Sequence, residues 1–273
     1  MPLVPMSEAL AGRRAVCAFN AVQLEVAEGI VAGAEAARTP VVLQLSENAV
    51  RFHGALAPIG EAFLALARSS SAPVVVHLDH ATEESLVDEA IALGFASVMY
   101  DGAHHEYADN AARTAAVVRR GHAAGVWVEA ELGRIGGKEG AHTPGVRTDP
   151  AEAAQFAGET GVDALAVAVG SEHAMRERTA SLDLGLIARI AASTGLPLVL
   201  HGSSGVADAA IVDAIAAGMR KINIGTHVGR VFTDAVRGAL ADESLIDPRR
   251  FITPGRAAVA AEVERMLRTL TPA

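Results

Sequence analysis

An aspartate and a histidine directly follow one apolar run, and their side chains are well suited to acid–base or metal chemistry. Residues 73–80 read PVVVHLDH, a run rich in β-branched residues that begins with a proline and ends in Asp79 and His80. Such a run predicts a strand buried on both faces. Because side chains alternate along a strand, we expect Asp79 and His80 to diverge, with one of them turning into a site at the carboxyl end. An isolated pair of this kind is more often a polar strand end beside a helix cap, so the interpretation depends on recurrence.

The same pattern recurs at nearly every apolar run of the chain. The residues that follow these runs are Asn20, Ser46, Asp79, His80, Asp101, Glu129, Glu131, Ser171, His173, His201, Gly202, Asn223 and Thr226. Four of them, His80, Glu131, His173 and His201, come from four different runs. Imidazoles with one carboxylate and no thiolate suit Zn²⁺ or a similar divalent ion in an open catalytic site. No short motif such as HExxH supports the metal site, so it depends on the fold bringing these residues together.

The other histidines are interpreted as core, helix or surface residues, with His53 placed in a loop. These are His53, His77, His104, His105, His122, His142 and His227.

Two glycine-containing segments, 200–205 and 222–226, also follow apolar runs. Gly202, Ser204 and Thr226 make a donor-rich cradle there, which is typical of a phosphate site at the start of a helix. The alternative is that Ser203 and Asp208 in this region only cap the next helix.

Helix-length amphipathic segments alternate with the apolar runs, and this alternation must position the site. The strand-like runs are residues 15–19, 40–45, 73–78, 96–100, 126–130, 164–169, 197–200 and 221–224. The helical segments are 23–38, 58–68, 83–93, 107–124, 150–160, 184–194, 208–217 and 228–240, with an extra helix expected at 254–270. Eight such units in 273 residues predict an α/β fold, a single (β/α)₈ TIM barrel spanning residues 1–273. A Rossmann-like sheet is the alternative, but Asn20-Ala21-Val22 stands where its Gly-rich turn would follow the first strand.

One connection, 132–150, is too long for an ordinary strand-to-helix loop. It contains Gly133, Gly136, Gly137, Gly140 and Gly145. A Gly-rich loop of this length inside a compact domain is usually functional, often a lid over a site. We therefore expect residues of this loop to take part in the chemistry.

Composition limits the partners and the compartment. The chain has 23 Lys and Arg against 32 Asp and Glu, a net charge of −9, which argues against nucleic acid or an anionic membrane as a partner. A phosphorylated substrate remains compatible, because local backbone N–H groups hold phosphates whatever the global charge. The single Cys17 cannot form an internal disulfide, and no signal peptide or membrane-spanning run is recognised. We expect a soluble, cytoplasmic protein.

Taken together, these segments resemble the class II, metal-dependent ketose-bisphosphate aldolases of the fructose- or tagatose-bisphosphate type. The motifs are HLDH at 77–80, EAELGRIGG at 129–137, VGSEH at 169–173, LHGSSG at 200–205 and KINIGT at 221–226, with AFN at 18–20 and DGAHHEYADN at 101–110. They occur in the family's order from about residue 8 to 270. The resemblance implies reversible aldol cleavage of a ketose 1,6-bisphosphate to dihydroxyacetone phosphate and glyceraldehyde 3-phosphate.

The resemblance also implies roles for individual residues. His80, His173 and His201 match the ligands of one catalytic zinc, and Glu131 matches a carboxylate that holds the metal in an alternate position. Asp79 matches the acid/base that removes the C4 hydroxyl proton. The remaining matches are Glu139 for the proton at the enediolate carbon, Asn223 for the dihydroxyacetone phosphate portion, Gly202, Ser204 and Thr226 for phosphate, Asp101 for an accessory metal or monovalent cation, and Asn20, Ser46 and Arg178 for substrate. A homodimer or homotetramer is expected from the family alone.

Departures from the family pattern leave the sugar and the hold on its phosphates open. They are Ala174, Arg176, Gly225 and Ala103. The alternatives are a class II aldolase for another phosphorylated ketose or keto acid, and a non-catalytic aldolase-like subunit. A Schiff-base aldolase is disfavoured, because Lys138 lies in the Gly-rich loop and Lys221 begins a strand, at the end away from the site.

Overall fold

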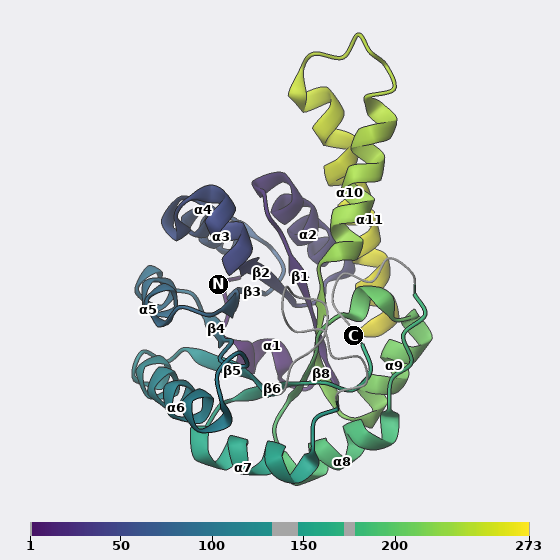
Figure 1. Ribbon diagram of the computed structural model, residues 1–273. Coiled ribbons are helices and arrows are strands. Elements are labelled where there is room, and N and C mark those ends of the chain that lie inside the picture. Colours follow the sequence, from purple (N-terminus) through teal and green to yellow (C-terminus); the bar gives the residue numbers. More distant parts are fainter. Residues whose placement is uncertain (1, 133–146, 172–177, 273) are drawn as a thin grey trace.

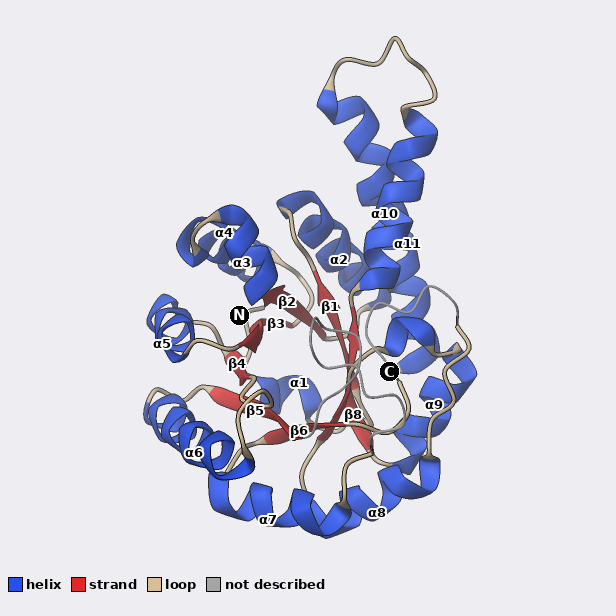
Figure 2. Cartoon of the chain, in the orientation of Figure 1, coloured by secondary structure: helices blue, strands red, loops and turns tan. Residues whose placement is uncertain are grey.

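Eight parallel strands close into a barrel, as the alternation predicts (Figures 1 and 2). The computed structural model describes residues 2–132, 147–171 and 178–272. The strands are β1 (Val16–Asn20), β2 (Val41–Ser46), β3 (Val74–Ala81), β4 (Ser97–Tyr100), β5 (Trp127–Leu132), β6 (Ala164–Val167), β7 (Leu198–Leu200) and β8 (Met219–Ile224). Each strand pairs with the next, and β8 pairs with β1 through partners such as Phe19 and Ile224. All eight carboxyl ends therefore meet at one rim.

Helices surround this barrel (Figure 2). They are α1 (Met6–Leu10), α2 (Leu24–Ala37), α3 (Glu47–His53), α4 (Leu56–Ser69), α5 (Glu84–Leu93), α6 (Tyr107–Ala123), α7 (Pro150–Thr160), α8 (Leu184–Thr194), α9 (Asp208–Ala217), α10 (Thr226–Ala239) and α11 (Pro248–Leu270), with a short 3₁₀ turn at Ser203–Gly205. None of the helices in the described part of the chain is long and apolar enough to cross a membrane.

The extra helix at the end of the chain and the segment that contains His53 differ from the sequence prediction. The extra helix begins at Pro248 rather than 254, because Asp247 accepts a hydrogen bond from the Arg249 N–H and Pro248 occupies the first turn. The prediction that His53 lies in a loop is wrong. His53 ends α3, a helix that starts where the Ser46 side chain accepts from the Ala49 N–H.

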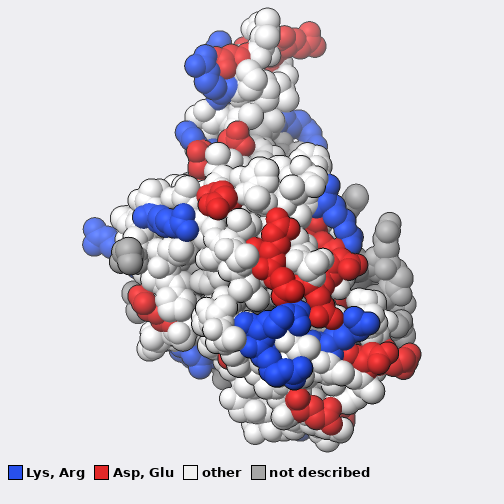
Figure 3. All heavy atoms as spheres, turned by 90° about the vertical axis from the view of Figure 1, so that its left-hand side faces the viewer, with Lys and Arg blue, Asp and Glu red and all other residues white. Residues whose placement is uncertain are grey.

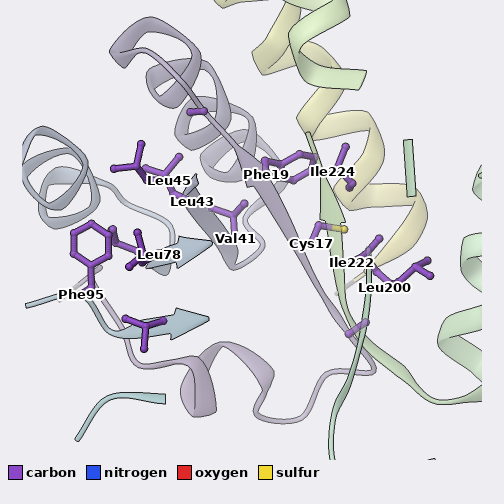
Figure 4. Packing of buried hydrophobic residues seen from close by; sticks show 14 of the residues in the cluster. Cys17, Phe19, Val41, Leu43, Leu45, Leu78, Phe95, Leu200, Ile222 and Ile224 are labelled. Atoms are coloured by element: carbon purple, nitrogen blue, oxygen red, sulfur yellow. The ribbon is translucent and has the colours of Figure 1, made fainter. Parts of the chain in front are cut away.

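The barrel has an apolar outside and a partly polar inside. Alternate residues of the strands, including Cys17, Phe19, Leu43, Leu78 and Ile222, belong to the cluster that packs under the helices (Figure 4). The remaining residues of the strands, which alternate with these, point into the barrel. At the amino-terminal end of the barrel, α1 covers them and forms an apolar cluster with them: Val4, Met6, Ala9, Leu10, Val16, Ala18, Val42 and Val75. Nearer the carboxyl ends of the strands, the inward-facing residues are polar, and they form the site described below.

Helices α10 and α11 project beyond the barrel as an antiparallel pair (Figure 1). The base of α11 packs closely on α2 at two glycines. A Cβ on Gly33 would lie 2.6 Å from the Ala260 carbonyl oxygen, and one on Gly29 would lie 2.8 Å from that of Arg256. These glycines therefore set the distance between the two helices.

Charges of both signs lie side by side on the face shown in Figure 3. Helices α5 and α6 contribute three ion pairs there: Arg113–Glu84 at 3.2 Å, Arg120–Glu84 at 2.9 Å and Arg120–Asp88 at 2.8 Å. Basic side chains of α6 on this face therefore lie next to acidic side chains of α5.

Candidate active site

A cavity of about 280 Å³ opens at the carboxyl ends of the strands. It is lined by Asn20, Ser46, Asn48, Asp79, His80, Gly202, Ser204, Asn223, Gly225 and Thr226. Except for Arg178, every residue predicted to bind substrate therefore lines this cavity. Asn48 was not predicted, because it lies in α3, a helix that the sequence reading missed.

Asp79 is held by amide groups from two other strands. Asn20 Nδ2 donates to Asp79 Oδ2 at 2.8 Å, and Asn223 Nδ2 donates to Asp79 Oδ1 at 3.4 Å. Gln44 Nε2 in turn donates to Asn20 Oδ1 at 3.1 Å, which fixes the orientation of that amide. Burial raises the pKa of Asp79, but the nearby charges of His80 and Lys221 outweigh it and hold the pKa well below its usual range. Asp79 is therefore a rigid carboxylate, ionised at neutral pH.

His80 does not diverge from Asp79 as the alternation of strand residues led us to expect. Its φ is +53°, in the left-handed region that residues other than glycine rarely adopt, and the pairing of β3 with β4 shifts register between Leu78 and Ala81. As a result, both Asp79 and His80 face the cavity. A residue in this conformation needs support from its surroundings.

Helix α3 supplies support for this turn. The buried Glu47 accepts hydrogen bonds from both the N–H and the hydroxyl of Thr82, two residues after His80. Arg51, one turn later on α3, pairs with the same carboxylate. On the other side, the Asp101 N–H donates to the Ala81 carbonyl at 2.7 Å. The segment after His80 is therefore anchored from two directions.

Two imidazoles and two carboxylates converge beside Asp79. The rings of His80 and His201 lie 4.5 Å apart between centroids. Glu131 Oε2 lies 3.2 Å from His201 Nδ1 and 3.9 Å from His80 Nδ1, and Asp101 Oδ2 lies 2.8 Å from His80 Nδ1. Two overlapping groups, Asp79–His80–His201 and His80–Asp101–Glu131, each offer ligand atoms within 4.8 Å of one another. This donor set of nitrogen and oxygen atoms fits a divalent metal ion.

Below these residues, a network of polar side chains lies inside the barrel. Lys221 Nζ donates to Glu129 Oε2 at 2.7 Å, and Glu129 Oε1 lies 3.2 Å from His201 Nε2. His77 Nε2 lies 3.5 Å from the Lys221 ammonium, and its Nδ1 contacts Ser97 Oγ at 2.8 Å. None of these side chains is more than 3% exposed. The sequence analysis listed Glu129 among the residues at the strand ends and assigned no part in the site to Lys221 or His77. All three nonetheless lie on the inward face that they share with Glu131, Asn223 and Asp79.

This network sets the protonation of its members. Burial and the Lys221 charge lower the pKa of His77 to about 3, so His77 is neutral. Burial raises the pKa of Glu129, but Lys221 and the hydrogen bond to His201 outweigh it and lower that pKa to about 2. Burial lowers the pKa of His201, whereas its hydrogen bonds to Glu129 and Glu131 raise it to about 9. Metal binding at His201 therefore requires the release of a proton, after which Glu129 holds the remaining one on Nε2.

The loops after β7 and β8 lie together, as expected of a phosphate site. Gly202 has a φ of +69° before the 3₁₀ turn, and Ser204 Oγ accepts from the His227 N–H at 3.2 Å. Ser203 does not cap a helix through its side chain. Its hydroxyl donates to the Asn223 carbonyl and joins the two loops.

Among the described residues, Arg178 is the one predicted site residue that belongs neither to the cavity lining nor to the metal-type donor set. His173 and Glu139 lie outside the described residues. Arg178 is described, but its Nε donates to the Val206 carbonyl at 2.8 Å and its guanidinium pairs with Asp208. The Ser171 hydroxyl donates to the His201 carbonyl at 2.6 Å, which links the segment after β6 to the histidine that follows β7.

Comparisons with known proteins agree with this geometry. Residues 5–273 match the family model described as fructose-bisphosphate aldolase class-II. The chain is 40% identical over 263 residues to the fructose-bisphosphate aldolase of Geobacillus stearothermophilus, with 94% of this chain and 92% of that protein covered. It is 37% identical over 276 residues to the 6-phospho-5-dehydro-2-deoxy-D-gluconate aldolase of Shouchella clausii, with 98% and 94% covered. The crystal structure of the YdjI aldolase from Escherichia coli K12 superposes with a TM-score of 0.83 at 29% identity, over 94% of this chain and 91% of that one.

Proposed function

This chain belongs to the class-II fructose-bisphosphate aldolase family, and we propose that it reversibly cleaves a ketose 1,6-bisphosphate to dihydroxyacetone phosphate and glyceraldehyde 3-phosphate. The observation that carries the proposal is the position of Asp79, an ionised carboxylate that both adjoins the metal-type donor set and lines the substrate cavity. Cleavage of the C3–C4 bond needs a base at the C4 hydroxyl, beside the centre that stabilises the charge left on the other fragment. This family is metal-dependent, and we propose zinc as the metal.

In this proposal, Asp79 takes the proton of the C4 hydroxyl during cleavage and returns it during condensation. Asn20 and Asn223 hold both oxygens of its carboxylate, so the base is oriented before the substrate arrives. Ser46, Gly202, Ser204 and Thr226 line the same cavity and are positioned to receive phosphate groups. Asn223, which also lines the cavity, orients the dihydroxyacetone phosphate portion.

His80, His201 and Glu131 would hold the metal together with His173, and Asp101 would serve an accessory cation beside His80. When bound, a divalent ion supplies Lewis-acid stabilisation of the negative charge that develops on substrate oxygens. Glu139 would transfer the proton at the enediolate carbon, in the fragment that becomes dihydroxyacetone phosphate. Arg178 remains a proposed phosphate contact, although reaching a phosphate requires it to leave Asp208.

The experiment that tests this function is cleavage of a panel of ketose bisphosphates and monophosphates, with and without a chelator. We expect turnover of a 1,6-bisphosphate that the chelator abolishes and added zinc restores. Asp79→Ala should lower turnover by roughly 10²–10⁴ while the protein still binds the metal. Unchanged turnover in Asp79→Ala would remove this residue from the mechanism, and activity that resists the chelator would contradict the metal-dependent reaction.

A second substrate class is favoured by one specific observation. The relative named for 6-phospho-5-dehydro-2-deoxy-D-gluconate is 37% identical, against 40% for the relative named for fructose bisphosphate. Substrates that carry only one phosphate therefore belong in the panel. Greater kcat/KM for a monophosphorylated keto acid would assign the chain to that class of aldolase.

Assembly and location are proposed on the basis of family membership and composition. We propose a homodimer or homotetramer in the cytoplasm, acting on a phosphorylated sugar and binding neither nucleic acid nor membranes. The net charge of −9 supports the absence of polyanionic partners. Light scattering on the purified chain measures its assembly directly.

A further inference from the structure

A second cavity lies at the amino-terminal end of the barrel, away from the candidate active site. Its volume of about 480 Å³ exceeds the 280 Å³ of the substrate cavity. The segment that enters β1, helix α9 and the end of α11 form its walls. The lining residues used here are Arg13, Arg14, Thr269 and Thr271.

This cavity is basic. Arg13 and Arg14 are the charged residues among its described lining, and no acidic residue belongs to that lining. Arg13 Nη1 is buried, and within the described part of the chain it has no hydrogen-bond partner. Neither arginine forms an ion pair with any described carboxylate, whereas Arg120, Arg178 and Arg265 elsewhere all do.

A third guanidinium joins the same segment from β8. Arg220 Nη2 donates to the Arg13 carbonyl at 2.9 Å, so the two residues are in direct contact. Arg220 Nε is also buried, and it too has no acceptor among the described residues. Buried N–H groups of charged side chains are costly to leave unsatisfied, and Arg13, in the cavity lining, and the adjoining Arg220 each carry one. An anion is the ligand that would satisfy them.

We propose that this cavity is a binding site for the phosphate group of a small phosphorylated molecule. Guanidinium groups match a tetrahedral oxyanion, because their planar N–H donors bind two of its oxygens at once. The threonine hydroxyls donate to helix carbonyls, Thr269 to Arg265 and Thr271 to Leu267, so the arginines are the donors available to a ligand. The volume leaves room for an organic group beyond the phosphate. Because Arg13 and Arg14 precede β1, this site is separate from the rim that holds Asp79.

The test is a titration of the zinc-loaded protein with inorganic phosphate, in which isothermal titration calorimetry measures the binding. We expect two classes of bound phosphate, one of which a substrate analogue displaces. In the double variant Arg13→Met/Arg14→Met, the class that the analogue does not displace should weaken by at least about tenfold, because charge-assisted hydrogen bonds are lost. Arg68→Met is the control, since Arg68 is an exposed arginine on α4 without an ion pair among the described residues.

The outcomes separate this site from the proposed function. Aldol cleavage in phosphate-free buffer should be the same in the double variant as in the parent protein, and unchanged melting without phosphate would confirm its fold. Should the double variant fail to fold, Arg14→Met tests the same site by removing only the exposed one of the two lining guanidinium groups. Phosphate binding in the variants that equals the parent's, an equal loss in Arg68→Met, or a single class of phosphate fully displaced by the analogue would overturn the proposal.

Discussion

Removing the Lys221 charge should destabilise the barrel strongly, and the effect can be estimated from the structure. Lys221 Nζ and Glu129 Oε2 lie 2.7 Å apart, and both side chains are at most 3% exposed. At an effective dielectric constant of about 20, their attraction is about 6 kcal/mol. Lys221→Met keeps most of the side-chain volume but takes from the buried Glu129 the cation that contributes most to its low pKa. Removal of one partner of a buried pair costs about 3–5 kcal/mol, and we expect a value in this range.

The assay is denaturant unfolding of the chelator-treated protein, so that metal binding does not contribute to the measured stability. The double variant Lys221→Met/Glu129→Gln removes both charges and should lose less than Lys221→Met alone, because the carboxylate that Lys221 compensates is then neutral. Arg237→Met is a matched control, since the Arg237–Asp234 pair has a similar length of 2.8 Å but is 73% and 60% exposed. That variant should change the stability by no more than about 0.5 kcal/mol.

The pH dependence of this destabilisation has a definite sign. With Lys221 present, the pKa of Glu129 is lowered to about 2, so its contribution to stability is present above its unfolded pKa and is lost as the pH falls toward 2. Without Lys221 that pKa rises, and protonation neutralises the buried carboxylate in mildly acidic solution. The difference between parent and Lys221→Met should therefore be larger at pH 7 than at pH 4. A loss no larger than in Arg237→Met, or a double variant less stable than Lys221→Met, would refute the reasoning.

Three further predictions concern the packing, the thiol and the turn at His80. Gly33→Ala should destabilise the fold by about 1–3 kcal/mol in denaturant unfolding, because its Cβ would lie 2.6 Å from the Ala260 carbonyl, whereas Gly158→Ala, with nothing within 4 Å, should stabilise α7 by about 0.5–1 kcal/mol. Equal effects would contradict the close packing of α2 on α11. Burial raises the pKa of the Cys17 thiol to about 12, so a thiol reagent at pH 8 should label the unfolded chain and leave the native one unmodified. Glu47→Ala should weaken metal binding in a chelator competition by roughly tenfold, because the Thr82 contacts after His80 are lost. Arg51→Met keeps those contacts and should bind the metal normally. An equal loss of metal affinity in both variants would contradict the role of the Glu47–Thr82 contacts.

The barrel and most of its rim follow from the sequence, because each strand is buried on both faces. Such strands read as short apolar runs, and the residue after each run must lie at the same end of the sheet. Asn20, Asp79, His201 and Asn223 were found in this way. The short helix α3 was missed because it begins directly after the last residue of β2, without turn residues that would indicate a new element. Asn48 was missed for the same reason.

The Lys221–Glu129 pair could also have been found, but by a different signal. Lys221 precedes Asn223 by two positions and Glu129 precedes Glu131 by two, so each shares the inward face of a residue already assigned to the site. A lysine and a glutamate that both point into a closed barrel are expected to form an ion pair, because neither charge can reach water. What the sequence does not reveal is that their partner is His201, since that depends on the order of strands around the barrel.

The conformation of His80 is the step that no local pattern predicts. A positive φ is uncommon for any residue other than glycine, and the alternation of β3 would send the His80 side chain toward the helices. The turn is stabilised by Glu47 from α3 and by the Asp101 backbone from the end of β4, two segments that are remote in sequence. Residues that break a local rule and are stabilised by remote contacts tend to be functional ones. Because this turn brings the imidazole of His80 beside the carboxylate that precedes it, one strand would supply both the metal ligand and the base of the proposed mechanism. In that mechanism, the exception to the alternation is what allows Asp79 and His80 to act on the same substrate.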